Sequence, residues 1–578
     1  MINGDLTQSI YLLLLFLIAG TPLVLAGACC TTKGKMVSRF LPLAAVPALL
    51  ASYFVPAEMV VEVPWFFMSG RMGLDGLGRL FLPVSAFIWL LAGLSGRKYL
   101  ESDPHRARFS FFFLTAMAGN FGLILARDIL GYYLFFALMS FAAFGLVIHK
   151  GTKEAHKAAR IYLLFVMIGE IALFLALALI ADKTNTLMMA KITDPALSPV
   201  TLFLLFTGFG IKIGVLPLHG WMAESYQATP VPAATALAGA MVNAGLLGWL
   251  RFIPLSEIVS PNGALLFMIL GALAALYGII VGLTEKRAGA ILAYSSISQM
   301  GLMTVVFGLG LTGFEAGRQA LLILMIYTTH HSLAKTSLFL GYGVMKSQPR
   351  DPSKWQLAGL YLPALALAGL PFTSGAVAKS AFKEFAISNG EPWLGLSGFF
   401  LPLTAIGTTV LVLHFIEVVQ RNEGPTTGIK PVDRNSWWLS LLAVALTIWL
   451  WPAASIQASH TLEPIKIWQA IWPVITGGLL YLVWPMVATR KKNEKNDYFP
   501  EISSLTGNTT EFDWTGKLNR VAKWFQQNGK TRKIDWGKRD SAAKIDLRLR
   551  QTEKIMQRWT IVGLSYLLLG IALYFLLI

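Results

Sequence analysis

Three lysines lie inside stretches of sequence that are otherwise apolar enough to cross a membrane. Lys212 follows FTGFGI, Lys335 follows HHSLA, and Lys379 follows SGAVA. A charged side chain at the centre of a bilayer costs about 3 kcal/mol on insertion scales. Such residues persist mainly where they face a polar interior and carry ions or protons. Three of them in one chain therefore predict a route for charge through a membrane protein.

Glu170 is the carboxylate near the centre of an apolar stretch in the first half of the chain, within VMIGEIALF. Burial favours a neutral lysine, whereas a nearby carboxylate favours the charged form. A lysine whose carboxylate partner can move away is therefore a tunable proton acceptor. We expect Glu170 to be the partner of Lys212, with a purely structural ion pair as the alternative.

Histidine and tyrosine side chains extend the pattern around Lys335. His331 lies four residues before Lys335, and Tyr327 four residues before that, so the three share one face of a helix. This spacing predicts a hydrogen-bonded wire of tyrosine, histidine and lysine. His330 faces elsewhere, and we expect it to pack. His219, in PLHGW, is expected to shape a turn or to admit protons at the end of a span.

The composition indicates which elements must hold these side chains. Hydrophobic residues make up 55% of the 578 residues and charged residues 14%, against about 25% in soluble domains. Long apolar runs recur from Tyr11 to Ile578. A backbone in lipid must satisfy its own hydrogen bonds, which points to helices. We expect an all-α polytopic membrane protein with about 14–16 transmembrane helices.

Proline and glycine interrupt two of the lysine-bearing stretches. Pro217 and Gly220 follow Lys212. Gly369 and Pro371 precede Lys379. Broken helices at membrane depth are tolerated where they line a polar cavity or are covered by protein. We expect each of these two lysines to lie beside a broken helix.

Basic and acidic loops alternate along the chain. The loops rich in lysine and arginine are 33–39, 97–108, 150–160, 286–287, 346–354 and 421–434. Cytoplasmic loops carry an excess of these residues. We therefore expect a multi-pass protein of a prokaryotic inner membrane, with these loops cytoplasmic and the N-terminus outside. The net charge of +17 then reflects loops, and no nucleic-acid motif supports a nucleic-acid partner.

Residues 490–557 break the apolar pattern because they are polar and mostly basic. One helical face of this segment collects apolar side chains, namely Leu518, Val521, Trp524 and Phe525. This predicts an amphipathic helix along the cytoplasmic membrane surface, with a solvated tail as the alternative. A last transmembrane span is expected at 558–578.

Motifs for catalysis within this chain are lacking. The two cysteines, Cys29 and Cys30, are adjacent and cannot supply a spaced metal or cluster site. The sequence has no HExxH pattern, Gly-rich phosphate loop or nucleophile elbow. We therefore expect no cofactor and no metal in this chain, and a soluble enzyme is not indicated.

Four blocks occur in a fixed order between about residues 110 and 390. They read VLPLHGWMAESYQATPVPAATALAGAMVNAGLLGWLR, KRAGAILAYSSISQMGLM, HHSLAKTSLFLGYGV and LAGLPFTSGAVAKSAFKE. In this order they resemble the antiporter-like subunits of respiratory complex I, Mrp-type cation/proton antiporters and membrane-bound hydrogenases. The wording is most similar to the formate hydrogenlyase/hydrogenase-4 type and to the complex I subunit L type.

This resemblance implies two inverted five-helix repeats, each with a broken helix. It implies that Lys212 is the central lysine of the first repeat, Lys335 the bridging lysine, and Lys379 the terminal charge of the second repeat. The full relay would then comprise Glu170, Lys212, His331, Lys335 and Lys379. Side chains expected to assist or gate the relay are His219, Tyr327, Asn243 and Glu224.

The expected organisation follows from these repeats and from the charge pattern. It comprises N-terminal transmembrane helices at 1–108, a first repeat at 109–253, a second repeat at 254–420, C-terminal transmembrane helices at 421–489, a basic segment at 490–557 whose lateral helix would occupy about 512–556, and a final helix at 558–578.

The chain departs from the family pattern at three positions. The family usually has a glutamate in a WELMS-like block, which here reads YLFFALMSF with Ala137 at that place. Leu237 and Asn243 occupy positions where relatives often have histidine or lysine. Subunit L-type relatives carry an acid in the sixth span that matches Glu170. Either Glu170 has taken over as the partner of Lys212, or the first half-channel is impaired.

The resemblance implies a proton-translocating subunit of an energy-converting complex, similar to NADH-quinone oxidoreductase or a membrane-bound hydrogenase. Its partners would be other antiporter-like and small membrane subunits and a peripheral redox arm that supplies the electrons. One alternative is an Mrp-type sodium/proton antiporter subunit, although carboxylates and carbonyls suit sodium better than lysines do. A second alternative, motivated by Ala137, is a membrane anchor with a degenerate channel.

Overall fold

The computed structural model describes residues 2–56, 59–63, 70–189, 197–347, 353–389, 395–421 and 431–490. The expected lateral helix and the expected last span at 558–578 lie outside these residues. The described helices as far as Tyr481 form one compact unit, and Leu482 begins a second, of which only the end of one helix is described. Glu170 and the three lysines all belong to the first unit.

The N-terminal part combines helices with one short hairpin. Its elements are α1 (Ile2–Cys29), α2 (Gly34–Val37), η1 (Ser38–Phe40), η2 (Pro42–Ala45), α3 (Val46–Phe54), β1 (Val60–Val63), β2 (Gly70–Gly73) and α4 (Gly76–Tyr99). The two strands pair antiparallel, with Val60 opposite Gly73 and Val63 opposite Gly70. Asp75 caps α4 by accepting a hydrogen bond from the backbone of Gly78.

The segment expected to form the first repeat is largely helical over its described length. It contains α5 (Arg106–Leu125), α6 (Ile129–Val147), α7 (Lys153–Thr184), α8 (Pro199–Ile213), α9 (Met222–Ala228), α10 (Val231–Ala236), the π-helical turn η4 (Leu237–Met241) and α11 (Asn243–Phe252). Asp128, Thr152 and Ser198 cap α6, α7 and α8 with their side chains. Such caps satisfy backbone N–H groups that a helix start leaves without partners.

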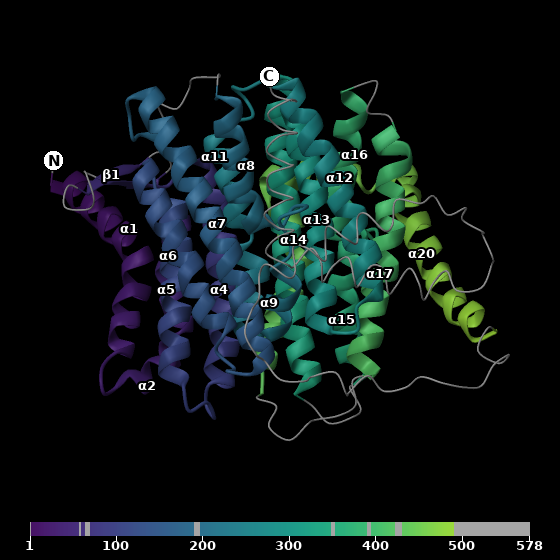
Figure 1. Cartoon of the computed structure of the whole chain (residues 1–578), viewed down its shortest axis with the longest axis horizontal. Coiled ribbons are helices and arrows are strands. Elements are labelled where there is room, and N and C mark those ends of the chain that lie inside the picture. The colour runs from purple at the N-terminus through teal and green to yellow at the C-terminus, as the bar shows by residue number, and fades with distance from the viewer. Residues whose placement is uncertain are drawn as a thin grey trace, which may run out of the picture. The chain divides into compact units, whose positions relative to one another are not determined.

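The remaining described helices complete the bundle. They are α12 (Pro261–Thr284), α13 (Ala288–Gly310), α14 (Phe314–Lys346), α15 (Lys354–Ala368), α16 (Ser374–Ser388), η5 (Leu396–Phe400), α17 (Leu401–Arg421), α18 (Arg434–Leu450), α19 (Pro452–His460) and α20 (Pro464–Arg490). In Figure 1 the long helices from α4 to α17 stand side by side, as expected of a membrane bundle.

Within the described residues, ten helices are long and apolar enough to cross a membrane, or up to twelve if two bent pairs are counted as spans. This confirms an all-α polytopic membrane fold. The larger number expected from the sequence included α14, whose middle carries polar and titratable residues, the short α8, and a span outside the described residues. That the two halves are inverted repeats stays a prediction.

Two helices break where glycine and proline predicted. α8 ends at Ile213 and is followed by Gly214, whose φ of +76° lies in the left-handed region; the short α9 begins after a turn. α15 ends at Ala368 and is followed by Gly369, with a φ of +94°, and α16 begins at Ser374. Glycine adopts this conformation without the steric cost that a Cβ atom imposes. Lys212 lies just before the first break, and Lys379 lies on the helix that follows the second.

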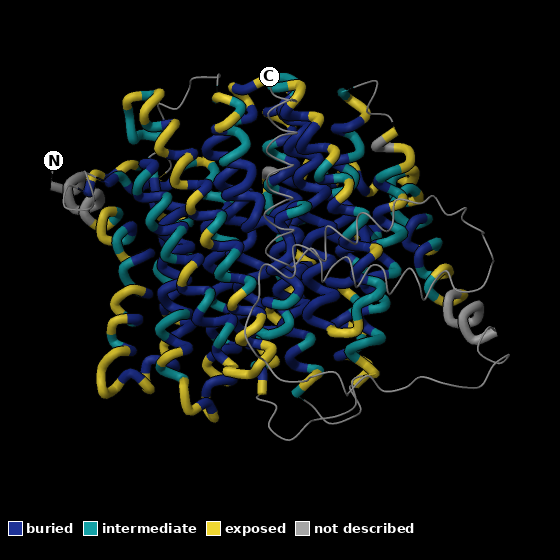
Figure 2. The backbone as a smooth tube through the Cα atoms, in the orientation of Figure 1, coloured by how far each residue is buried: buried dark blue, intermediate teal, exposed yellow. Residues whose placement is uncertain are grey.

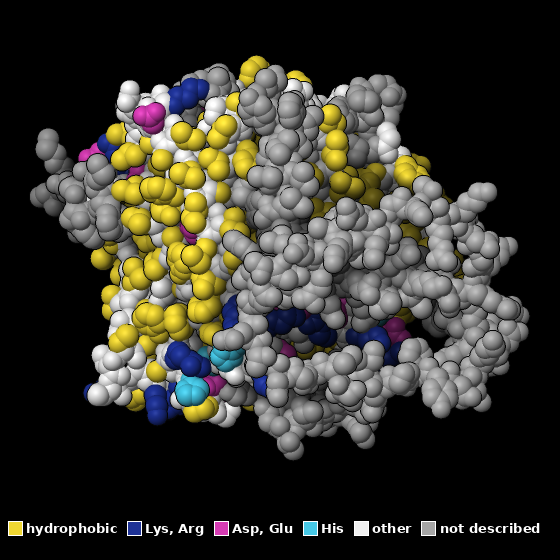
Figure 3. Space-filling view, viewed as in Figure 1, with side chains coloured by type: hydrophobic (Ala, Val, Ile, Leu, Met, Phe, Trp, Pro, Cys, Tyr) yellow, Lys and Arg dark blue, Asp and Glu magenta, His cyan; other side chains and the backbone are white. Residues whose placement is uncertain are grey.

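Burial follows the arrangement of the bundle. Every residue of α13 is buried, and α14 is buried almost continuously from Tyr327 to Gly341. Figure 2 shows these two helices running through the buried middle of the structure. On the face formed by α6 and α7, hydrophobic side chains form a broad band and charged ones gather toward its ends (Figure 3). Phe141 on α6 and Met167 and Ile171 on α7 are exposed, as expected for helices that face lipid.

Candidate functional site

Lys212 occupies the last turn of α8, immediately before the first break, and is 5% exposed. Its Nζ donates a hydrogen bond to Ser140 Oγ on α6 at 3.2 Å and lies 3.5 Å from the hydroxyl of Tyr162 on α7. It also lies 5.7 Å from the ring centre of Phe136. The partners of this ammonium group are therefore hydroxyls and aromatic faces.

Glu170, on α7, is as deeply buried as Lys212, and the two side chains interact electrostatically. The Ser140 hydroxyl lies between them, because it interacts with the Glu170 carboxyl and also accepts from Lys212. No ion pair within 4.0 Å joins the two among the described residues, and Glu170 Oε2 has no hydrogen-bond partner there. A carboxyl with an open acceptor is equipped to receive a proton.

Lys335 is fully buried in α14, and its Nζ donates to the backbone oxygen of Leu292 on α13 at 2.8 Å. His331 is fully buried one turn earlier, and neither ring nitrogen has a hydrogen-bond partner in the described structure. Tyr327 donates to Gln299 Oε1 at 2.9 Å. The predicted wire is therefore not joined by hydrogen bonds, because Tyr327 and Lys335 each bind a different group on α13.

His330, which we expected only to pack, has a specific polar contact. Its Nδ1 is 2.8 Å from Ser374 Oγ, at the first residue of α16, and it interacts electrostatically with Lys379. A Cβ atom at Gly375 would lie 3.0 Å from the His330 ring, so α16 approaches α14 closely at this point. His330 thus connects the helix that bears Lys335 to the helix that bears Lys379.

Lys379 lies on α16, after the second break, and is partly buried. Its Nζ donates to the backbone oxygen of Ala368, the last residue of α15, at 2.8 Å. The last carbonyls of a helix carry partial negative charge, so this is a favourable place for an ammonium group. A cavity of about 140 Å³ adjoins it, and Lys383 and Lys466 also line that cavity.

Asn243 joins the two halves of the chain. Its Nδ2 donates to Gly239 O at 2.7 Å, within the π-helical turn, and to Ser332 Oγ on α14 at 2.6 Å. A cavity of about 20 Å³ lies beside it, lined also by Asn120 and Thr328. One water needs roughly 10–15 Å³, so this polar cavity has room for a water molecule. π-Helical turns often mark functional sites.

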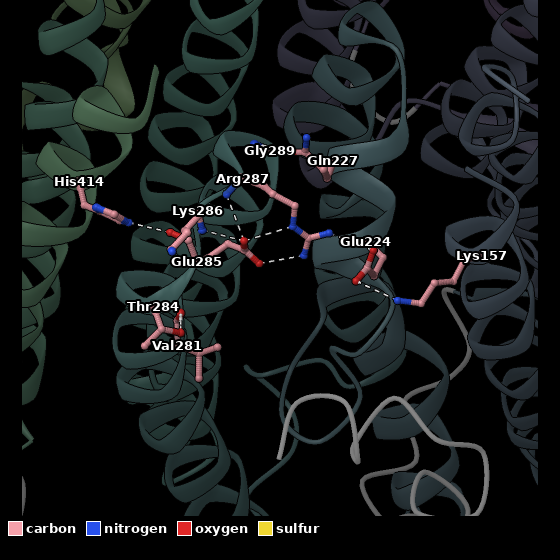
Figure 4. A network of polar contacts seen from close by, with 10 residues as sticks. All are labelled: Lys157, Glu224, Gln227, Val281, Thr284, Glu285, Lys286, Arg287, Gly289 and His414. Carbon is pink, nitrogen blue, oxygen red and sulfur yellow. Dashed lines mark hydrogen bonds and ion pairs between the residues drawn. The ribbon is translucent and has the colours of Figure 1, made fainter. Parts of the chain in front are cut away.

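His219 and Glu224 contact residues on several neighbouring elements. His219 is buried in the turn after α8 and packs against Tyr277 on α12, with ring centres 4.8 Å apart. Glu224, on α9, forms ion pairs with Lys157 at 3.4 Å and with Arg287 at 3.2 Å. These contacts belong to a network that joins α7, α9, the α12–α13 loop and α17 (Figure 4).

Glu285 holds Arg287 from the other side in this network. Their side chains form a 2.8 Å ion pair, and Glu285 also accepts from the backbone of Lys286 and Arg287. Burial opposes ionisation of Glu285, but the bonds from Arg287 outweigh it and lower the pKa of that carboxyl. The hydrogen bond to Glu285 in turn raises the pKa of Arg287. Both groups are therefore charged at neutral pH.

Sequence reasoning did not identify several polar partners. Ser140 and Tyr162 contact Lys212, Ser374 contacts His330, and two backbone carbonyls hold the other lysines. Ser140 lies in the same block as Ala137, so its spacing could have indicated it. A backbone carbonyl has no sequence signature at all. Among the described residues, no group of three or more His, Cys, Asp or Glu is arranged to hold a metal ion.

Known proteins share both sequence and fold with this chain. Hydrogenase-4 component B of Escherichia coli (strain K12) is 24% identical over 55% of this chain and 51% of its own length. NADH-quinone oxidoreductase subunit N of Desulforudis audaxviator (strain MP104C) is 27% identical over 66% of this chain and 80% of its own. The chain therefore spans about half the length of the hydrogenase component.

A solved structure supports the same fold. A chain of the Mrp complex from Dietzia sp. DQ12-45-1b matches with a TM-score of 0.69 at 22% identity, over 91% of this chain and 61% of that one. Residues 126–404 match the sequence profile described as NADH:quinone oxidoreductase/Mrp antiporter, TM. This range contains Glu170 and all three lysines. Residues 126–404, which contain the four sequence blocks, therefore resemble the transmembrane region of this family, as those blocks predicted.

Proposed function

We propose that this chain moves protons across a membrane as an antiporter-like subunit of a multisubunit energy-converting complex. The main support for this proposal is that Lys212, Lys335 and Lys379 each donate a hydrogen bond to a neutral hydroxyl or carbonyl oxygen. A lysine fixed by a close carboxylate stays charged, whereas a buried lysine bound to neutral groups can release its proton. Glu170 supplies a buried carboxyl near the first of them.

The driving reaction belongs to partner subunits. Moving one charge against 100 mV requires about 2.3 kcal/mol, and the chain offers no redox motif that could supply it. The named relatives are components of a hydrogenase and of an NADH-quinone oxidoreductase. By analogy, the redox cofactors lie in a peripheral arm, and other membrane subunits lie beside this chain.

The proposed orientation follows the charge of the loops. Lys157, Lys286 and Arg287 lie near helix ends on the side that we assign to the cytoplasm. The N-terminus then lies outside, and the membrane is the cytoplasmic membrane of a prokaryote. Residues 490–557 would be cytoplasmic.

Replacement of Lys212 by methionine tests the proposal. The complex that contains this chain is reconstituted in vesicles, and proton uptake is measured together with the driving reaction. Uptake should be lost in the Lys212→Met variant, because methionine keeps the apolar stem and removes the titratable group. Lys35→Met, at an exposed residue of the short helix α2, is the matched control and should leave uptake intact. Normal uptake in Lys212→Met would contradict the proposal.

A sodium/proton antiporter is the second candidate, favoured by the fold shared with the Mrp complex chain. Carboxylate and carbonyl oxygens bind sodium better than ammonium groups do, so the lysines count against it. An imposed sodium gradient should change the internal pH of vesicles if this candidate is correct. If sodium has no effect while the driving reaction acidifies the vesicles, the antiporter candidate is excluded.

A further inference from the structure

Lys335 lies next to a hydroxyl on the neighbouring helix. Lys335 Nζ and Ser296 Oγ both donate to the backbone oxygen of Leu292, at 2.8 Å and 3.1 Å. The ammonium and hydroxyl groups therefore converge on one acceptor. Leu292 lies little more than one turn from Ala288, where α13 begins after the basic loop. Lys335 thus reaches toward the end of α13 that follows the loop of Lys286 and Arg287. We call this side of the bundle the basic-loop end.

Tyr226, on α9, continues this line away from Lys335. Its hydroxyl interacts with the Ser296 hydroxyl, yet it has no partner of full hydrogen-bond geometry among the described residues. The ring is 2% exposed and packs edge-on against Phe339 and Trp221, at 5.5 Å and 6.1 Å between ring centres. A buried hydroxyl left without a partner costs about 1–3 kcal/mol, so it calls for an explanation. A role in passing protons provides one.

The same short helix carries Glu224 two residues earlier, at the basic-loop end of the bundle. Glu224 binds Arg287 and Lys157, and Figure 4 shows Arg287 reaching Glu224 and Glu285 at the same time. Arg287 therefore has two carboxylate partners between which its contacts can shift.

Close packing seals the same place. Gln227 Oε1 accepts from the backbone N–H of Gly289 at 2.9 Å, and a Cβ atom at Gly289 would lie 2.9 Å from Gln227 Cα. α9 and α13 thus touch beside Tyr226 in the conformation described. Access from the basic-loop end requires this contact to loosen.

We propose that Tyr226 and Ser296 form the inlet through which Lys335 receives protons from the basic-loop end, and that the Glu224–Arg287 ion pair is its gate. The inference rests on the proposed function and specifies a route for it. A hydroxyl both donates and accepts. Each can therefore accept an incoming proton on oxygen and release its own onward, and the last proton binds the neutral Nζ of Lys335. Neither hydroxyl changes its net charge after the transfer.

Tyr226→Phe tests the inlet in the intact complex. Phenylalanine keeps the ring between Phe339 and Trp221 and removes only the hydroxyl. Proton uptake driven by the partner reaction should fall at least about tenfold, within the range that a positioned proton-transfer group contributes. Ser296→Ala should act in the same direction. Tyr132→Phe is the matched control, since Tyr132 is also fully buried but donates to Ala244 O at 3.1 Å; uptake should change less than about twofold.

A second substitution at Tyr226 distinguishes a role of its hydroxyl in proton transfer from a role in packing. Tyr226→His restores a group that both donates and accepts, and it should recover part of the uptake lost in Tyr226→Phe. The ratio of the proton uptake rates in ordinary water and in heavy water should also differ between Tyr226→Phe and the parent. Arg287→Met removes the gate and should increase passive proton leak severalfold without the driving reaction.

Different results would contradict the inlet through Tyr226 and Ser296 and the proposed proton translocation. If Tyr226→Phe takes up protons like the parent while Lys335→Met does not, the inlet is wrong and the proposed function stands. If Lys335→Met also takes up protons normally, the proposed function itself fails. If Tyr226→His is no better than Tyr226→Phe despite equal amounts of assembled complex, a conducting role for the hydroxyl is overturned.

Discussion

Lys212 and Lys379 lie at similar helix breaks but have different surroundings. Lys212 precedes its break, and its ammonium group meets hydroxyls with the Glu170 carboxyl behind them. Lys379 follows its break and donates to Ala368 O, at the negative end of the α15 dipole. Lys379 also adjoins a cavity of about 140 Å³, which at roughly 30 Å³ per water has room for several molecules.

Different groups therefore stabilise the charged form of each of the two lysines. Around Lys212, the charged state depends on one buried carboxyl reached through one hydroxyl. Around Lys379, a fixed dipole and water in the cavity can stabilise the charge, so no carboxylate is needed in contact. The Lys212 region should therefore be sensitive to loss of its acid, and the Lys379 region should tolerate changes at its rim.

Glu170→Gln should have the largest effect. Glu170 interacts with Lys212, and Ala137 stands where the resemblance places a glutamate, so we expect the Lys212 region to depend on Glu170. Proton uptake should fall by about a hundredfold or more, the scale of a lost general acid or base. Asp182→Asn, at an exposed residue of the same helix, is the control. Equal uptake by Glu170→Gln and parent would mean that the Lys212 region does not need its acid.

Ala137→Glu should partly reverse that loss. Ala137 lies one turn from Ser140 on α6, so a glutamate there starts from the helix that already contacts Lys212. The measurement is proton uptake of Glu170→Gln with and without Ala137→Glu. A double variant no better than Glu170→Gln alone would favour a degenerate first half-channel.

Ser140→Ala should have an intermediate effect. The hydroxyl both accepts from Lys212 and interacts with Glu170, so its loss removes the link between them. A hydrogen bond to a charged group contributes about 1.5–3 kcal/mol, which corresponds to a tenfold or larger decrease in uptake rate. Ser380→Ala beside Lys379 is the matched control, because the Ser380 hydroxyl donates to Glu384, at 3.4 Å, rather than to the lysine. Similar losses in both variants would remove the contrast between the two regions.

Glu384→Gln, which removes the charged partner of Lys466 beside the Lys379 cavity, should have a small effect. Glu384 pairs with Lys466 at 2.6 Å, but both side chains are partly exposed, and such pairs contribute about 0–1 kcal/mol. Uptake should change less than about threefold, and the melting temperature of the complex only slightly. A loss as large as that of Glu170→Gln would show that Lys379 also depends on a carboxylate.

The pH dependence of the Figure 4 network should be the smallest effect. Glu285 has a pKa below its ordinary value of 4.5, so its contribution to stability is present above that value. The contribution is lost as the pH falls through the lowered pKa. Glu285→Gln should therefore reduce the melting temperature slightly at pH 7 and not at strongly acidic pH. An equal reduction at both would show that charge is not responsible.

Much of the fold was predictable because apolar length and loop charge dominate the physics of a membrane chain. The positions of Lys212, Lys335 and Lys379 beside polar groups followed from the cost of burying charge. The helix breaks followed from glycine and proline. These are properties of single residues and short windows, which a sequence shows directly.

The contacts between helices were less accessible. His330 and His331 are adjacent in sequence, and helical spacing could not show that α16 lies against the first and that the second has no hydrogen-bond partner in the described structure. Tyr327 likewise shares a face with His331 yet donates to Gln299 on another helix. Which neighbour covers each face depends on packing across the bundle, and single-helix periodicity does not contain it.

Proton translocation per turnover in the Lys335→Met complex is the most direct test of the role proposed for the buried lysines. Lys335 is fully buried on α14, which Asn243 of α11 contacts through Ser332 and which contacts α16 through His330. The driving substrate is added to vesicles that contain the assembled complex, and the number of protons translocated per turnover of the driving reaction is measured. We expect fewer protons per turnover than in the parent, with the complex still assembled. An unchanged ratio would mean that protons do not pass through Lys335.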